Sequence, residues 1–198
     1  MNDEYLTIDG LAQSEIKVKG SRFIATAKPV GTEGEAKSFL QQISSEFRDA
    51  THHSYAYRLK GGIFRFSDAG EPSGTAGKPI LRAIDSQGLT DLALVVSRFF
   101  GGIKLGVGGL IRAYHQAALS CLQGARVVTA YITEDLTLEF PYDQTNAVKG
   151  VLAQFGAVIT SENYSERVQL KVAIRRSLIE RFQEAMNEVT NGKTKITF

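Results

Sequence analysis

Hydrophobic and polar positions follow two periodicities along the chain, and each predicts a different secondary structure. Residues 35–47 repeat apolar side chains at the three- and four-residue spacing of a helix with one buried face. Thr32 and Glu35 form a capping box at its start. Residues 54–59 alternate like a half-buried strand, and residues 91–100 are dense enough in apolar residues for a central strand covered on both faces. The same reasoning predicts strands at 14–18 and 22–29 and helices at 78–86 and 110–122.

The last third of the chain has a clear order of elements. It predicts a strand at 127–140, a helix at 143–155, strands at 157–163 and 166–174, a helix at 178–189 and a strand at 193–198. This β-α-β-β-α-β order is the split unit of ferredoxin-like domains. We therefore expect an α+β protein of two α/β sandwich domains, residues 1–125 and residues 126–198, the second of them ferredoxin-like.

Composition narrows the class of protein. The chain has 198 residues, of which 43% are hydrophobic, so it can bury a substantial core. No apolar run approaches the roughly 20 residues that span a bilayer, and the acidic start does not have the pattern of a signal peptide. A single cysteine, Cys121, excludes an internal disulfide and a multi-cysteine zinc site. We expect a cytoplasmic protein with no membrane partner.

Charge is distributed unevenly. The formal net charge is only +2, but residues 16–112 carry 14 Lys and Arg against 8 Asp and Glu, a surplus of six. Residues 126–198 carry nine of each sign. An anionic partner is therefore to be sought on the first domain, although such a surplus also serves simply to keep a surface soluble.

Glycine is clustered in two predicted loops, where the backbone is expected to approach a ligand, a nucleic-acid backbone or another segment of the same fold closely. Eleven of the 19 glycines lie between Gly61 and Gly109, and one group stands between a predicted strand and a predicted helix. Free N–H groups at a helix start attract anions, and basic side chains nearby would add charge. The spacing is neither a P-loop nor a dinucleotide fingerprint. A tight turn that needs positive-φ residues is the alternative. The candidate anion-binding residues are Arg98, Gly101, Gly102, Lys104, Gly106, Gly108 and Gly109, with Lys78, Arg22 and Arg58 as weaker candidates beside Arg65.

A second segment, residues 67–78, is turn-forming throughout. Its carboxylates and hydroxyls could bind a cation or accept a proton, or could instead satisfy the loop's own backbone, with Asp68 in an Asx-turn. Two carboxylates are too few for a convincing calcium site, and we favour the structural role. The residues of this possible site loop are Asp68, Glu71, Ser73 and Thr75, with His52 and His53 as neighbours.

The histidines and the cysteine give no recognisable catalytic set. His52 and His53 are adjacent in a predicted strand, so their side chains point to opposite faces and do not easily share a metal. Cys121 lies near a helix C-terminus, where the dipole opposes a thiolate, and we expect it in the core. We therefore expect no metal and no cofactor.

Four runs of residues resemble the YigZ/IMPACT family. They are Lys19-Gly20-Ser21-Arg22-Phe23, His52 to Tyr57, Phe66 to Pro79 and Val95 to Leu110. The resemblance implies a first domain similar in fold to the fourth domain of elongation factor G and to a ribosomal-protein domain, and a second domain similar to the fifth domain of that factor. The eukaryotic relative, IMPACT, regulates translation through a protein partner, using a further domain that this chain does not match.

Two functions follow as hypotheses. The first is a non-enzymatic, translation-linked binding protein whose basic, glycine-rich face contacts RNA, the ribosome or a translation-associated protein, with Tyr55 or Tyr57 stacking on a base. The second is an enzyme or small-molecule binder that takes a phosphorylated metabolite or nucleotide at the Gly101–Gly109 loop. If the loops at 68–78 and 98–109 and a histidine enclose one pocket, the second hypothesis gains. If they spread along an open basic face, the first gains. The oligomeric state is left open.

Overall fold

The chain forms two compact units, each with its own sheet. A computed structural model describes residues 3–198, and these divide into Leu6–Thr129 and, as the second unit, residues 3–5 with Ala130–Phe198. The predicted α+β class with two domains is confirmed. The chain passes between the units after Thr129, and the first described residues lie in the second unit.

The first unit is built on a five-stranded antiparallel sheet. Its strand order is β2-β3-β6-β4-β5. The strands are β2 (Ala12–Val18), β3 (Ser21–Pro29), β6 (Leu92–Phe99), β4 (His52–Arg58) and β5 (Phe64–Ser67). As its dense apolar pattern predicts, β6 is the middle strand, and seven of its eight residues are buried. β5 was not predicted, because its four residues are too few and too exposed to show a period.

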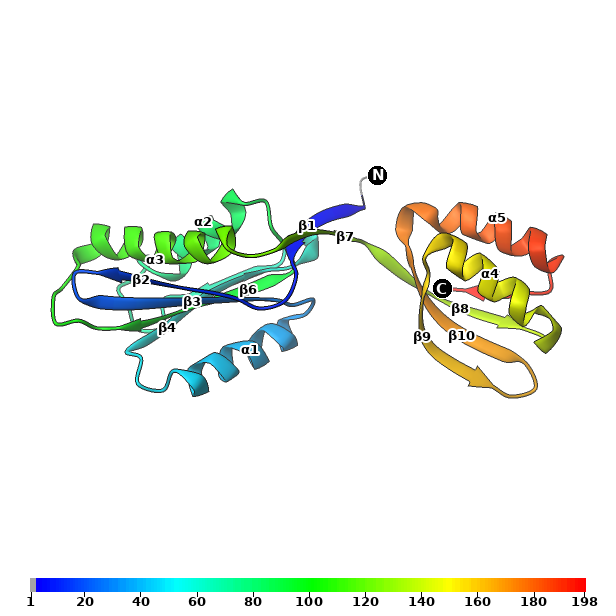
Figure 1. The fold of residues 1–198 in the computed structure, drawn as a ribbon, viewed down its shortest axis with the longest axis horizontal. Coiled ribbons are helices and arrows are strands. Elements are labelled where there is room, and N and C mark those ends of the chain that lie inside the picture. The colour runs from blue at the N-terminus through cyan, green and yellow to red at the C-terminus, as the bar shows by residue number, and fades with distance from the viewer. Residues whose placement is uncertain (1–2) are drawn as a thin grey trace. The chain divides into compact units, whose positions relative to one another are not determined.

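Helices cover both faces of this sheet (Figure 1). On one face lie α2 (Gly77–Ser86) and α3 (Gly106–Gln123), and on the other lies α1 (Glu33–Glu46). Thr32 accepts a hydrogen bond from the Glu35 N–H, as the predicted capping box requires. The face under α2 and α3 packs Phe23, Leu94 and Tyr114 together, so the wider core lies on that side. A short 3₁₀ turn, η1 (Lys60–Gly62), links β4 to β5.

Cys121 lies in this wider core, as expected. Its thiol is buried and donates to the carbonyl of Ala12. Burial raises the pKa of Cys121 to about 12, so the thiol stays protonated and unreactive at neutral pH.

A separate two-stranded sheet contains the segment in which the chain leaves the first unit. It pairs β1 (Glu4–Ile8) with β7 (Val127–Tyr131). The prediction of a single strand over 127–140 is wrong, because the chain changes partner at Ile132. The following strand, β8 (Thr133–Phe140), pairs instead with strands of the second unit. β1 was not predicted.

The second unit has the ferredoxin-like order that the sequence predicts. Its four strands stand in the order β11-β8-β10-β9, and α4 and α5 cover one face (Figure 1). The remaining elements are η2 (Tyr142–Gln144), α4 (Thr145–Phe155), β9 (Val158–Tyr164), β10 (Val168–Arg175), η3 (Arg176–Leu178), α5 (Ile179–Thr190) and β11 (Lys195–Thr197). Leu138, Phe140 and Phe182 are fully buried in its core.

One carboxylate ties the start of the chain into the second unit. Asp3 is buried and accepts two hydrogen bonds from Nε and Nη2 of Arg175 and one from the Ser177 N–H. These bonds, with that of Arg175 first, hold the pKa of Asp3 well below its ordinary value. Asp3 is therefore charged throughout the physiological range.

Among the described residues, no helix is both long enough and apolar enough to cross a membrane.

Candidate functional site

The two glycine-rich segments meet at one end of the first unit's sheet. The end of β6 and the start of β4 lie beside the loop at 68–76, and the loop at 100–105 leads from β6 into α3. Phe23, Arg98 and His52 are paired directly across β3, β6 and β4. Residues paired in this way point to the same face of a sheet, here the face under α2 and α3.

A buried ion pair holds the segments together. Nη1 of Arg98 donates to Oε1 of Glu71 over 2.6 Å, and the hydroxyl of Tyr114 donates to the same oxygen over 2.7 Å. The side chains of Arg98 and Glu71 are 6% and 3% exposed. Burial, followed by the bond to Glu71, raises the pKa of Tyr114 far above its ordinary value, so this hydroxyl remains a donor. The pair joins the central strand to the loop 27 residues earlier in the chain.

Arg98 is therefore not the open phosphate contact that the sequence suggested. Because β6 is the middle strand, its side chains on this face lie beneath the helices. Two nitrogens of Arg98 donate hydrogen bonds, one to Glu71 and one to Ser21. Its Nε is buried and has no hydrogen-bond partner among the described residues. The residues that follow the strand, from Phe100 to Lys104, are exposed.

The two histidines of β4 lie on opposite faces, as the alternation of a strand predicts. Nδ1 of His52 is 2.8 Å from the carbonyl of Ala69, and its Nε2 lies 4.0 Å from Glu71. Nδ1 of His53 is 2.9 Å from the hydroxyl of Ser97. Burial, and then the neighbouring His52, lowers the pKa of His53. His52 thus belongs to the cluster around Glu71, whereas His53 does not.

Asp68 fastens its own loop. Its two carboxylate oxygens accept hydrogen bonds from the N–H groups of Gly74, Ala76 and Gly77 at 2.8 to 2.9 Å, at the start of α2. Burial would raise the pKa of Asp68, but these three donors outweigh it and lower the pKa below 3.8. Asp68 thus serves the loop's backbone, the structural role that the sequence favoured, but its donors lie six to nine residues on and not two, as in the predicted Asx-turn.

The two hydroxyl residues of the same loop differ in burial. Thr75 is buried and donates to the carbonyl of Pro72 over 2.6 Å, so it too closes the loop. Ser73 is exposed. Among residues 3–198, no three His, Cys, Asp or Glu side chains are grouped so as to hold a metal ion.

Replacing Asp68 by alanine is expected to lower the free energy of unfolding by about 2 kcal/mol at pH 7, because three N–H donors lose their acceptor. The folded pKa lies below the ordinary 3.8. The stabilisation is therefore complete above that pH and is lost as the pH falls through the folded pKa. Urea unfolding at pH 7 and at pH 3 should show the difference between variant and parent shrinking in acid. Asp49→Ala, which removes an exposed carboxylate of the same unit, is the control. An equal loss at both pH values would contradict this role.

Three glycines are needed where the chain packs against itself. A Cβ on Gly101 would lie 1.9 Å from the carbonyl carbon of Gly20, one on Gly77 would lie 2.7 Å from the backbone of Ser67, and one on Gly70 would lie 3.2 Å from the His52 ring. At these positions the partner that comes close is the same fold and not a ligand.

Two other candidate glycines shape the approach to α3. Gly102 and Gly106 adopt positive φ, at 83° and 70°. The helix begins at Gly106 and not at residue 110, so Gly108 and Gly109 belong to its first turn and not to a loop. This 18-residue helix has no side-chain cap and no acidic residue in its first turn. Its first N–H groups therefore face solvent at the positive end of the helix dipole.

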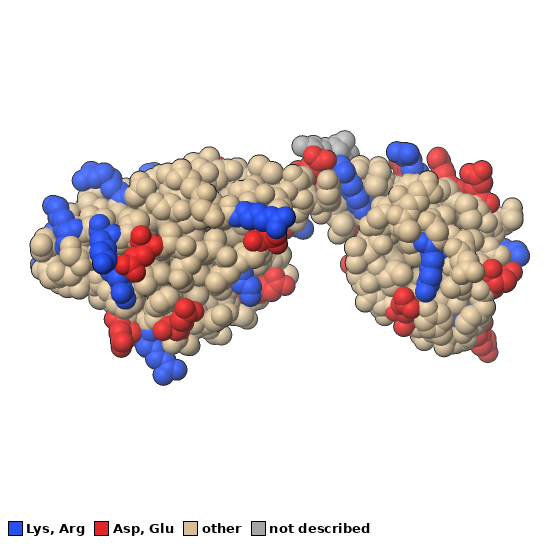
Figure 2. Space-filling model, viewed as in Figure 1, with Lys and Arg blue, Asp and Glu red and all other residues tan. Residues whose placement is uncertain are grey.

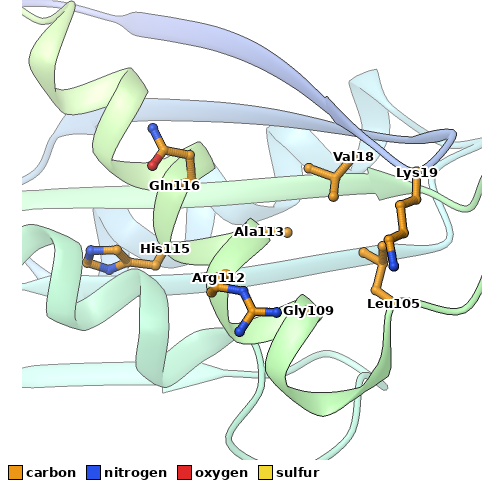
Figure 3. A pocket seen from close by; sticks show the side chains of 8 residues that line it. All are labelled: Val18, Lys19, Leu105, Gly109, Arg112, Ala113, His115 and Gln116. Atoms are coloured by element: carbon orange, nitrogen blue, oxygen red, sulfur yellow. The ribbon is translucent and has the colours of Figure 1, made fainter.

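A pocket of about 430 Å³ lies on one side of this helix start. We call it the Lys19 pocket. Figure 3 shows Lys19 extending from the β2–β3 turn toward Leu105, while Arg112 projects from α3 and His115 lies at the opposite end. The full lining is Val18, Lys19, Leu105, Gly109, Arg112, Ala113, His115 and Gln116. It combines two cations with an apolar floor.

A second pocket, of about 290 Å³, lies on the other side of the helix start. We call it the Arg98 pocket. Both loops contribute to it, and the two pockets share Leu105. Its lining is Glu71, Pro72, Arg98, Phe100, Lys104, Leu105, Gly106, Val107 and Leu110. The loops at 68–78 and 98–109 thus converge on one hollow, with His52 behind Glu71.

The other predicted cations differ in availability. Lys78 and Lys104 are exposed. Arg22 is exposed but lies 4.3 Å over the Phe99 ring and 3.9 Å from Glu15. Arg58 forms an ion pair with Asp85. Of these, Lys104 stands at the convergence of the loops.

The two tyrosines suggested for stacking on a base differ in exposure. Tyr57 is buried, and its hydroxyl donates to Glu33, so it cannot meet a base. Tyr55 is half-buried. The aromatic ring that stands at the pocket is that of Phe100, which is 49% exposed and was not predicted as a site residue.

Lys19 and Arg112 were also missed as candidates. They are 93 positions apart, and neither lies in a glycine-rich loop. Their convergence depends on α3 packing against β2 and β3, which leaves no local signal.

The fold and the site together define a two-domain α+β protein whose first domain bears a basic end hollowed by two adjoining pockets. The description "Impact N-terminal domain" matches residues 19–122, and "Domain of unknown function (DUF1949)" matches residues 138–193. Among relatives, the IMPACT family member YvyE of Bacillus subtilis is 36% identical over 99% of this chain and 91% of its own length. The IMPACT family member YigZ of Escherichia coli is 31% identical over 91% of this chain and 90% of its own.

A solved structure described as a hypothetical protein shares the fold over 99% of this chain and 97% of its own, with a TM-score of 0.78 and 28% identity. The chain belongs to the IMPACT family.

Proposed function

We propose that this protein is a non-enzymatic, translation-linked binding protein that contacts RNA or the ribosome through the basic end of its first domain. A translation-associated protein is the other partner that this role allows. The cytoplasm is where such a partner is met, and there we expect the protein to act.

The observation that carries the proposal is the set of cations around the start of α3. Lys19, Lys104 and Arg112 are exposed and line the two pockets there. None of the three forms an ion pair with another residue of the described chain. Lys and Arg side chains gather at the end of the unit that carries the β2–β3 turn and this helix start, with a few carboxylates among them (Figure 2).

Such an arrangement suits a polyanion. Each cation can neutralise one phosphate and release its counterions, and the uncapped helix adds N–H donors with the favourable dipole behind them. The resemblance of the first domain to the fourth domain of elongation factor G, and the translational role of the eukaryotic IMPACT relative, support the ribosome as the setting.

The expected result of removing these charges is a large loss of binding. The triple variant Lys19→Ala, Lys104→Ala, Arg112→Ala should bind ribosomes at least about tenfold more weakly at low salt, because three phosphate contacts are lost. Co-sedimentation with purified ribosomes measures this.

The matched control is Lys28→Ala, Lys37→Ala, Arg82→Ala, which removes the same charges from exposed sites of the same unit that line neither pocket. It should bind like the parent. Equal weakening by both variants would show attraction by net charge alone, and an unaffected triple variant would contradict the proposed surface.

A second candidate function has one observation in its favour. The loops at 68–78 and 98–109 both line the Arg98 pocket, a half-open hollow of a size to take a small molecule such as a nucleotide or a phosphorylated metabolite. Thermal stabilisation of the protein by such compounds, in the absence of RNA, is the measurement that favours this candidate over the first.

A further inference from the structure

We propose that the Arg98 pocket receives a single nucleobase, turned out of an RNA strand whose phosphates lie along Lys104 and the start of α3. The inference rests on the proposed function in taking RNA as the source of the base. The pocket's volume of about 290 Å³ accommodates one planar heterocycle and not a folded segment of protein.

Two polar atoms at the floor of the pocket have no hydrogen-bond partner in the described chain. Nε of Arg98 is buried and has no partner among the described residues, although Arg98 as a whole is 5% exposed and lines the pocket. Arg98 and Tyr114 both donate to Oε1 of Glu71, and no described residue donates to Oε2. A buried donor without a partner is costly, and Oε2 of Glu71 is free to accept a hydrogen bond from a ligand in the pocket.

The character of the floor selects a base over a phosphate. Glu71 and Arg98 cancel each other's charge, and a carboxylate oxygen facing the hollow would repel an anion. A nucleobase is neutral and carries N–H donors on its edge, which the free Oε2 of Glu71 can accept. Phosphate is instead suited to the rim, where Lys104 stands.

The walls suit the flat faces of a base. Phe100, Val107 and Leu110 supply apolar surface, and Phe100 and Val107 are 49% and 60% exposed. The centre of the Phe100 ring lies 5.5 Å from the guanidinium carbon of Arg98, so the ring stands beside the floor. Aromatic rings in such positions stack on unpaired bases.

The test uses a short single-stranded RNA with one 2-aminopurine, a fluorescent base. On binding, its fluorescence should change, and duplex RNA of the same sequence should bind more weakly. Phe100→Ala should weaken binding of the single strand by about 5- to 100-fold and abolish the fluorescence change. Phe64→Ala removes an equally exposed ring from β5, outside the pocket, and should do neither. Thermal unfolding confirms that both variants are folded.

Further arms separate this proposal from the one it rests on. An RNA with an abasic site in place of 2-aminopurine should bind the native protein as weakly as the 2-aminopurine RNA binds the Phe100→Ala variant. If RNA binds, but no change of fluorescence occurs and Phe100→Ala behaves like Phe64→Ala, the base pocket is overturned while RNA binding stands. If RNA fails to bind but free 2-aminopurine riboside does so in a Phe100-dependent way, the pocket stands with a free nucleoside as its ligand. If neither binds, both proposals fall.

Discussion

Gly101→Ala is expected to destabilise the first domain by at least about 3 kcal/mol, although it adds only one methyl group. The added carbon would lie 1.9 Å from the carbonyl carbon of Gly20 and 2.1 Å from its oxygen. Both are backbone atoms of the β2–β3 turn, so no side chain can rotate away. The loop after β6 would have to separate from the turn, and the hydrogen bond from the Gly101 N–H to Ser21 would be lost.

Gly108→Ala is the matched control for this prediction. Gly108 lies in the first turn of α3, and an added Cβ there would have only the end of the Arg112 side chain nearby, at 3.5 Å. We expect its free energy of unfolding to be unchanged or raised, by no more than about 1 kcal/mol. Chemical denaturation of the two variants measures the contrast. A Gly101→Ala protein as stable as Gly108→Ala would show that the turn and the loop are not held together as described.

Arg98→Ala is expected to cost about 3 to 5 kcal/mol, the usual result of removing one partner from a buried ion pair. The side chain of Glu71 is 3% exposed and would keep only the hydroxyl of Tyr114 as a hydrogen-bond donor. The loss arises from the carboxylate left without its cation more than from any attraction that disappears. Circular dichroism during thermal unfolding follows it directly.

The double variant Arg98→Met, Glu71→Leu separates these two causes. It removes both charges and keeps apolar bulk in place, so it should be clearly more stable than Arg98→Ala. If the double variant is the less stable of the two, the pair contributes net attraction and the expectation is wrong. An Arg98→Ala protein within about 0.5 kcal/mol of the parent would show that the pair does not hold the loops.

Local sequence patterns predict much of the fold. The spacing of Phe39 and Ile43 gives the buried face of α1, and the density of apolar residues in β6 gives the central strand. The ferredoxin-like order of the second domain follows from the succession of its elements. The missed strands, β1 and β5, and the break at Ile132 depend on which partner each segment pairs with, and no local pattern records that.

The candidate site was predicted in its segments but not in the roles of its residues. Both glycine-rich segments do meet at one end of the sheet. Arg98 was expected at a phosphate because it precedes a glycine-rich loop, whereas its place on the middle strand buries it against Glu71. Lys19 and Arg112 approach each other only through the packing of α3 on the sheet. Such contacts, distant in sequence, decide which cation is free and which is engaged.

The central claim, that cations around the start of α3 contact phosphates, is tested most directly by the salt dependence of RNA affinity. The logarithm of the association constant should fall linearly with the logarithm of salt concentration. For a single strand, the slope of Lys19→Ala, Lys104→Ala, Arg112→Ala should be shallower than that of the parent by about 2, since three phosphate contacts are removed. The Lys28→Ala, Lys37→Ala, Arg82→Ala control should keep the parent's slope. A triple variant with the same slope as the parent would contradict the account.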